Sequence, residues 1–180
     1  NTALGIGAMD AITQGDYNVA IGYNAATALT TGGHNTLIGG LAGDSLTTGG
    51  SNVAIGYNAL AEEDTHSYNV AIGRNSLQLQ NAGADAYNVA VGYNTGMSVT
   101  TGVQNTLIGG LAGDALTTGL RNTAVGYSSI GATTTGHDNT AVGRSALEAI
   151  TGGGRNVAIG SYALSAEDGD GRNVAVGYSA

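Results

Sequence analysis

A five-residue motif, Asn-[Thr/Val]-[Ala/Leu]-[Ile/Val/Leu]-Gly, occurs eleven times in this chain of 180 residues. Successive copies start seventeen positions apart, as from Asn1 to Asn18, except for one step of nineteen between Asn69 and Asn88. A period this strict predicts a solenoid, in which similar coils stack and each contacts only its neighbours. The first residues of the eleven copies are Asn1, Asn18, Asn35, Asn52, Asn69, Asn88, Asn105, Asn122, Asn139, Asn156 and Asn173.

The composition predicts a narrow interior and excludes several classes of partner. Glycine accounts for 32 residues, while Pro, Cys, Trp and Phe are absent, so no wide core can be filled. The net charge of −8 disfavours nucleic acid and anionic lipid as partners. The absence of cysteine excludes disulfides and thiolate chemistry. No apolar run of about 18 residues or more is present, so we expect no membrane insertion by this segment.

Each motif reads as a short strand, since it is rich in β-branched residues and ends at glycine. Strand residues alternate between faces, so Val19 and Ile21 share one face and Ala20 lies on the other. Position 2 is always Val or Thr and position 4 always Ile, Val or Leu, and these two columns are expected to fill the coil. Position 3 is never polar, so we expect it to face outward against another chain. This predicted inter-chain face comprises Ala20, Leu37, Ala54, Ala71, Ala90, Leu107, Ala124, Ala141 and Ala158.

A second short strand is expected in each coil, near 26–30, 42–47 and 112–117, with an apolar residue at position 12 such as Leu29. Two strands and two turns account for one full repeat. The predicted fold is therefore all-β: a parallel β-roll, or β-solenoid, of about eleven 17-residue coils.

The sequence also contains a longer repeat unit that spans several coils. The segment 35–49 returns almost unchanged at 105–119, which indicates a duplicated four-coil block, 18–87 followed by 88–155. The two extra residues at the end of the first block are expected in a turn. We interpret 1–180 as a single repeat domain and expect it to be a fragment of a longer fibre.

The asparagine at position 1 is expected to form a structural ladder, because stacked Asn side chains can bond from coil to coil. Three other motifs are interpreted as turns. The GGLAGD strings at 39–44 and 109–114 lack the Lys-Ser/Thr of a phosphate loop. Asp168 and Asp170 resemble only the start of a calcium loop. The string at 62–66 brings carboxylates near His66, and we interpret it as an acidic loop. We therefore predict no metal site, no cofactor and no enzyme activity.

Position 6 carries a column of exposed aromatic and basic side chains. Neighbours one coil apart could form cation–π pairs, and the column is a candidate surface for inter-chain packing or for a ligand. Its residues are Tyr23, Tyr57, Arg74, Tyr93, Tyr127 and Arg144.

The repeat N-[TV]-A-[IV]-G-Y-N-A resembles the NSVAIG-type repeat in head domains of YadA-like trimeric autotransporter adhesins, and equally the NTAIGYNAL…TTG repeats in tailed-phage fibres. The resemblance implies that each chain is a left-handed roll and that three rolls form a homotrimer. The adhesin repeat is shorter than the present one, and the neck, stalk and membrane anchor of that family are absent from this sequence. The Thr-Thr-Gly turns favour the phage type.

This resemblance implies an extracellular role, on a cell surface or in a virion fibre, in attachment to a host. The partner would be a host-surface glycan or protein, and none is named by the sequence. Two alternatives remain: a filament or spacer without its own ligand site, and an ice-binding solenoid based on the Thr-Thr pairs, such as 30–31 and 47–48.

Overall fold

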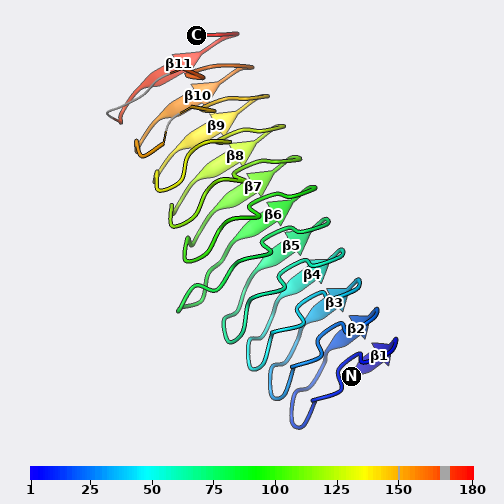
Figure 1. Ribbon diagram of the computed structural model, residues 1–180. Coiled ribbons are helices and arrows are strands. Elements are labelled where there is room, and N and C mark those ends of the chain that lie inside the picture. Colours follow the sequence, from blue (N-terminus) through cyan, green and yellow to red (C-terminus); the bar gives the residue numbers. More distant parts are fainter. Residues whose placement is uncertain (150, 167–170) are drawn as a thin grey trace.

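The protein, seen in a computed structural model, is a parallel β-solenoid whose coils stack in sequence order (Figure 1). Residues 1–149, 151–166 and 171–180 are described. Over these ranges there is no helix, and the predicted all-β solenoid is confirmed. Its strands are β1 Thr2–Leu4, β2 Val19–Ile21, β3 Thr36–Ile38, β4 Val53–Ile55, β5 Val70–Ile72, β6 Val89–Val91, β7 Thr106–Ile108, β8 Thr123–Val125, β9 Thr140–Val142, β10 Val157–Ile159 and β11 Val174–Val176.

All the strands belong to one parallel sheet in the order β1 to β11, so each coil adds one strand to the stack. The register never slips: Ala20 pairs with Leu37, and Ala71 pairs with Ala90 across the longer step. The extra residues lie between Asn81, which bonds the next coil at Thr100, and Ala86, which bonds the previous coil at Ser67. The insertion therefore lies in a turn, as predicted.

The predicted orientation of the strand was wrong. Position 3 faces the interior of its own coil: Ala20 and Leu37 are fully buried within a single chain. Positions 2 and 4, exemplified by Val19 and Ile21, are half-exposed on the outside. The cause is the asparagine at position 1, because its side chain is buried and alternation then turns position 3 inward as well. The nine residues assigned to an inter-chain face are therefore core residues.

The second strand predicted in each coil is absent from the described residues, where the far side of the coil is built from turns. Asn24 and Ala26 have φ angles of 51° and 54°, which no extended strand permits. The turns still bond from coil to coil, as Ala26 N–H donates to the Ala42 carbonyl. The spacing of apolar residues there resembled a strand, but the left-handed residues curl the backbone.

Core volume is shared between positions 3 and 9 of each coil. Where position 3 is leucine, as at Leu37, position 9 is glycine, and a Cβ on Gly43 would lie 3.0 Å from the Leu37 Cδ2 atom. Where position 3 is alanine, position 9 is usually larger, as in the buried pair Ala54 and Leu60. Such alternation of large and small residues lets a narrow interior reach close packing.

The glycine that ends each motif is required by geometry. Gly39 has a φ of +136°, which side chains rarely adopt, and a Cβ there would strike the carbonyl oxygen of Gly56 one coil away. Position 6 has no such requirement: it is Gly40 in this coil but tyrosine or arginine in most other coils. The fixed glycine thus keeps successive coils in direct backbone contact.

Candidate functional site

The predicted asparagine ladder is present along the edge of the sheet. The Asn35 N–H donates to Asn18 Oδ1 at 2.9 Å, and Asn35 Nδ2 donates to the Gly49 carbonyl at 2.9 Å. In most coils the side chain therefore satisfies one backbone group of the next coil and one of its own. Asn69, in the longer coil, is an exception, because its buried Nδ2 has no hydrogen-bond partner. This role is structural: the ladder fixes the spacing of the coils and the orientation of the strand beside it.

A second ladder, made of threonines, was not predicted. At position 13, Thr30 Oγ1 donates to the Thr47 carbonyl at 3.1 Å, and the same contact links Thr117 to Thr134 at 2.9 Å. The Thr-Thr pairs mark this column in the sequence. The sequence alone does not show which threonine of each pair bonds the next coil and which one is exposed. The second threonines are exposed: Thr31, Thr48, Thr101, Thr118 and Thr135.

The outer face of the sheet is the largest candidate interaction surface. It consists of positions 2 and 4 of every strand, and all of these residues are Val, Ile, Leu or Thr. The side chains are partly open to solvent: Ile108 is 40% and Ile159 is 41% exposed. An uncharged face that continues over many coils is typical of an interaction surface. We call these two columns the outer face.

The position-6 column borders the outer face. Its tyrosines are about half-exposed or more, from 49% at Tyr57 to 60% at Tyr23. The guanidinium carbon of Arg74 lies 5.9 Å from the ring centre of Tyr57, one coil away in the same column. Arg144 instead lies 4.6 Å from the ring centre of Tyr162, a partner at position 7 that the sequence reading missed.

A further column, at position 17, lies on the other side of the strand and was also missed. Tyr17 stacks on His34 and Tyr68 stacks on Tyr87, each pair with ring centres 5.0 Å apart. The regular spacing of these residues, one coil apart, could have identified the column from the sequence. The column was not recognised because its residue type changes along the chain, and its last members are Arg121, Asp138, Arg155 and Arg172.

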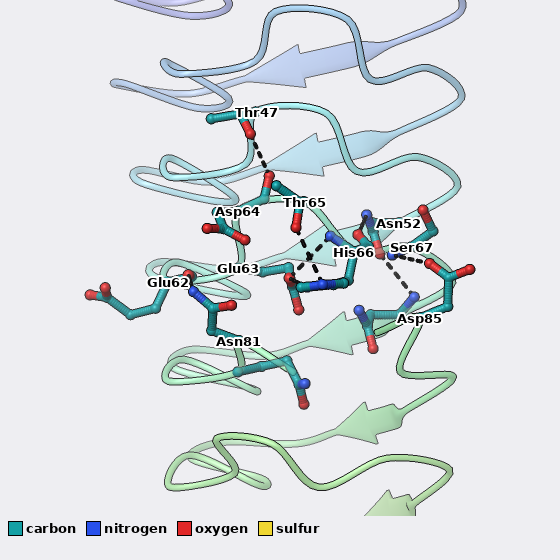
Figure 2. A network of polar contacts seen from close by, with 12 residues as sticks. Thr47, Asn52, Glu62, Glu63, Asp64, Thr65, His66, Ser67, Asn81 and Asp85 are labelled. Atoms are coloured by element: carbon teal, nitrogen blue, oxygen red, sulfur yellow. Dashed lines mark hydrogen bonds and ion pairs between the residues drawn. The ribbon is translucent and has the colours of Figure 1, made fainter. Parts of the chain in front are cut away.

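One coil carries a buried carboxylate (Figure 2). Glu63 occupies position 12, where Leu29 and Leu46 stand in other coils, and its side chain is fully buried. The His66 imidazole Nδ1 lies 2.7 Å from Glu63 Oε1, and the His66 backbone N–H donates to the same oxygen at 3.2 Å. The other oxygen, Oε2, is buried without a hydrogen-bond partner. Glu63 is therefore an incompletely compensated acid, in a column whose other buried members are uncharged residues such as Leu46 and Gln80.

The same coil supplies the groups that could hold a metal ion. One ligand atom each from Glu63, Asp64 and His66 lie within 4.8 Å of one another. This set of oxygen and nitrogen donors suits a divalent cation. All three residues belong to the loop that the sequence reading treated as an acidic turn. The calcium-like pair Asp168 and Asp170 lies outside the described residues.

Burial raises the pKa of Glu63 above its ordinary value, and the hydrogen bond from His66 opposes that shift. A carboxyl with a raised pKa in the folded state stabilises the fold below its ordinary pKa, and that contribution is lost as pH rises through the folded pKa. Glu63→Gln should therefore raise the free energy of unfolding at neutral pH, by about 1 kcal/mol. The gain should shrink toward pH 4, as measured by denaturant unfolding across a pH series.

The exposed neighbour Glu62 provides the control, because Glu62→Gln removes the same charge from the surface. This variant removes only a small repulsion that raises the pKa of Asp44, so its pH dependence should depart from the wild type much less than that of Glu63→Gln. A Glu63→Gln variant that also follows the wild-type curve from pH 4 to pH 8 would show that Glu63 does not titrate differently on folding.

Comparison with protein-family models, with curated proteins and with solved structures finds no match to this chain. Among the described residues, no helix is long and apolar enough to cross a membrane. The outer face and its two flanking columns thus provide the functional evidence, together with the repeat itself.

Proposed function

We propose that the chain is a rigid, self-associating segment of a trimeric attachment structure, a surface adhesin or a phage tail fibre. The observation that carries the proposal is the outer face, an uncharged stripe of Val, Ile, Leu and Thr side chains that extends over all eleven strands. Large exposed stripes of this kind are unfavourable in water unless they are covered.

The size of the outer face suits association between copies. Eleven strands at a spacing of about 4.8 Å give a length of about 50 Å. The outer face spans about 7 Å from position 2 to position 4, and the bordering position-6 column extends the surface to about 13 Å. The outer face and the position-6 column together cover roughly 650 Å², which approaches the ~800 Å² that each partner buries in a standard stable interface. The tyrosine and arginine columns would then lie at the rim, where interfaces are polar.

The resemblance of the repeat to adhesin heads and phage fibres supports three left-handed rolls as the assembly and host attachment as its purpose. In that setting the extracellular or virion location follows, and the partner is a glycan or protein on the host surface. Three copies on one particle would add avidity to weak individual contacts.

Light scattering of the isolated chain tests the assembly. We expect three times the chain mass of 17.6 kDa for the wild type. Ile55→Glu places a charge on the outer face, where Ile55 is half-exposed, and should yield folded monomers. The matched variant Thr48→Glu changes an exposed residue outside the sheet and should remain trimeric. A wild-type chain that is monomeric at micromolar concentration would overturn the proposed assembly.

A spacer without its own ligand site is the second candidate, favoured by the near-identity of the coils. Binding of the purified segment to a glycan array or to host cells separates the two roles. Specific binding supports an attachment head, whereas a trimer that binds nothing supports a spacer.

A further inference from the structure

An open groove of about 370 Å³ lies at the position-17 side of the last complete coils. It is lined by His137, Gly154, Arg155, Gly171 and Arg172. These residues come from three successive coils, so the stacking of the solenoid creates the groove. Its volume falls within the ~300–1,000 Å³ range that small-molecule sites usually occupy.

The backbone holds the two arginines side by side. The Arg155 N–H donates to the His137 carbonyl at 3.0 Å, and the Arg172 N–H donates to the Gly154 carbonyl at 3.0 Å. Both residues are in the left-handed conformation, with φ angles of 63° and 80°, like every position-17 residue before them. The two exposed arginine side chains therefore leave the backbone at equivalent positions of adjacent coils, which are about 4.8 Å apart.

Glycines keep the floor of the groove open. A Cβ on Gly154 would lie 3.0 Å from atoms of the His137 imidazole and 2.8 Å from the His137 carbonyl oxygen. A Cβ on Gly171 would strike the carbonyl of Gly154. With hydrogen alone at both places, peptide groups and the edge of an imidazole form the surface between the arginines.

Two of the described residues that line the groove are arginines and none of them is acidic. Arg121 is already neutralised, since its Nε and Nη2 atoms donate to the two oxygens of Asp138 at 2.6 and 3.1 Å. This hydrogen-bonded pair lowers the pKa of Asp138, and Arg155 adds a smaller effect in the same direction. Among the described residues, no carboxylate forms an ion pair with Arg155 or Arg172. Both arginines are exposed, on a chain of net charge −8.

We propose that this groove binds the carboxylate or sulfate group of an acidic saccharide. Guanidinium groups pair with such anions through two parallel hydrogen bonds, and the peptide groups between them can bond to sugar hydroxyls. The groove is lined by no aliphatic or aromatic side chain except the imidazole, so an apolar ligand gains little. An extended polyanion would be repelled by the acidic chain, whereas a single anionic group between the two arginines is attracted by both guanidinium groups.

This site deepens the proposed attachment role and depends on it only for where the saccharide is encountered. Binding is tested on the purified full chain, labelled at glycine for NMR and titrated separately with sialyllactose, sulfated lactose and neutral lactose. We expect saturable shifts of the Gly154 and Gly171 amide signals with one or both acidic sugars, and none with lactose. The two acidic probes distinguish a carboxylate from a sulfate as the recognised group.

Two double variants carry the same loss of charge. Arg155→Gln with Arg172→Gln should weaken binding by about tenfold or more. The control, Arg74→Gln with Arg144→Gln, removes two exposed arginines from the position-6 column and should bind like the wild type. All four arginines are exposed, and matching circular dichroism spectra will confirm that both variants fold.

Absence of shifts with both acidic sugars would overturn the site, as would equal weakening in the two double variants. Neither result would affect the assembly test, because the groove lies outside the two columns of the outer face. Conversely, a groove that binds acidic sugars on a monomeric chain would retain the site and remove the trimer.

Discussion

Replacing Asn105 with aspartate is expected to destabilise the protein by about 3–5 kcal/mol, the cost typical of an unpaired buried charge. Asn105 is fully buried; its Nδ2 donates to the Gly119 carbonyl at 3.0 Å and its Oδ1 accepts from the Asn122 N–H at 2.9 Å. Aspartate retains the acceptor but places a second oxygen against the Gly119 carbonyl. Denaturant unfolding at pH 7 provides the measurement.

The same variant has a defined pH dependence. Burial should raise the pKa of the new carboxyl, and its protonated form can donate to the Gly119 carbonyl. The loss of stability should therefore diminish as pH falls, because the folded state then binds the proton more tightly than the unfolded state does. Asn58→Asp is the matched control, at a partly exposed turn position, and should cost less than about 1 kcal/mol. Equal losses of stability at the two positions would show that a buried ladder asparagine contributes no more to stability than an asparagine in a turn.

Exchanging the large and small residues of one core pair should reveal strong coupling. Ala54→Leu overpacks a coil that already contains Leu60, and we expect a loss of about 1–3 kcal/mol. Leu60→Gly opens a cavity and should cost about 2–5 kcal/mol. The double variant recreates the Leu37–Gly43 arrangement found one coil earlier. It should therefore lose much less than the sum of the two single changes.

This cycle needs a pair that does not interact. Ala54→Leu combined with Leu116→Ala, which lies three coils away, is such a pair, and the two losses of stability should be additive. If the Ala54 and Leu60 changes also add without coupling, volume exchange between positions 3 and 9 does not control packing of the core.

The stack was predictable from the sequence because periodicity reports register directly. Every strand of the sheet starts one residue after an asparagine of the motif. The orientation of the strand was not predictable from residue size, because large apolar residues at positions 2 and 4 suggested a core. The decisive fact was the buried asparagine, and a sequence does not show whether a polar side chain faces water or a backbone.

Some side-chain contacts were likewise predictable from the sequence and others were not. The Arg74–Tyr57 contact followed from position 6 alone, since both residues occupy one column. The Glu63–His66 pair was recognised as a cluster, but its burial was not, because an acidic loop normally lies in solvent. The groove at Arg155 and Arg172 needed the turn geometry, which places position 17 beside position 16 of the preceding coil.

The unbroken register has a consequence for how such a chain can change over generations. The Asn88 N–H reaches Asn69 across 19 residues just as Asn105 reaches Asn88 across 17, so surplus residues are absorbed in a turn while the ladder continues. Gain or loss of one whole coil would change the neighbours of only the two coils at the junction, and the new neighbours would have the same backbone register. Recombination between coils can therefore lengthen or shorten the rod in steps of about 4.8 Å, and the binding surfaces at its sides can diversify separately from its length.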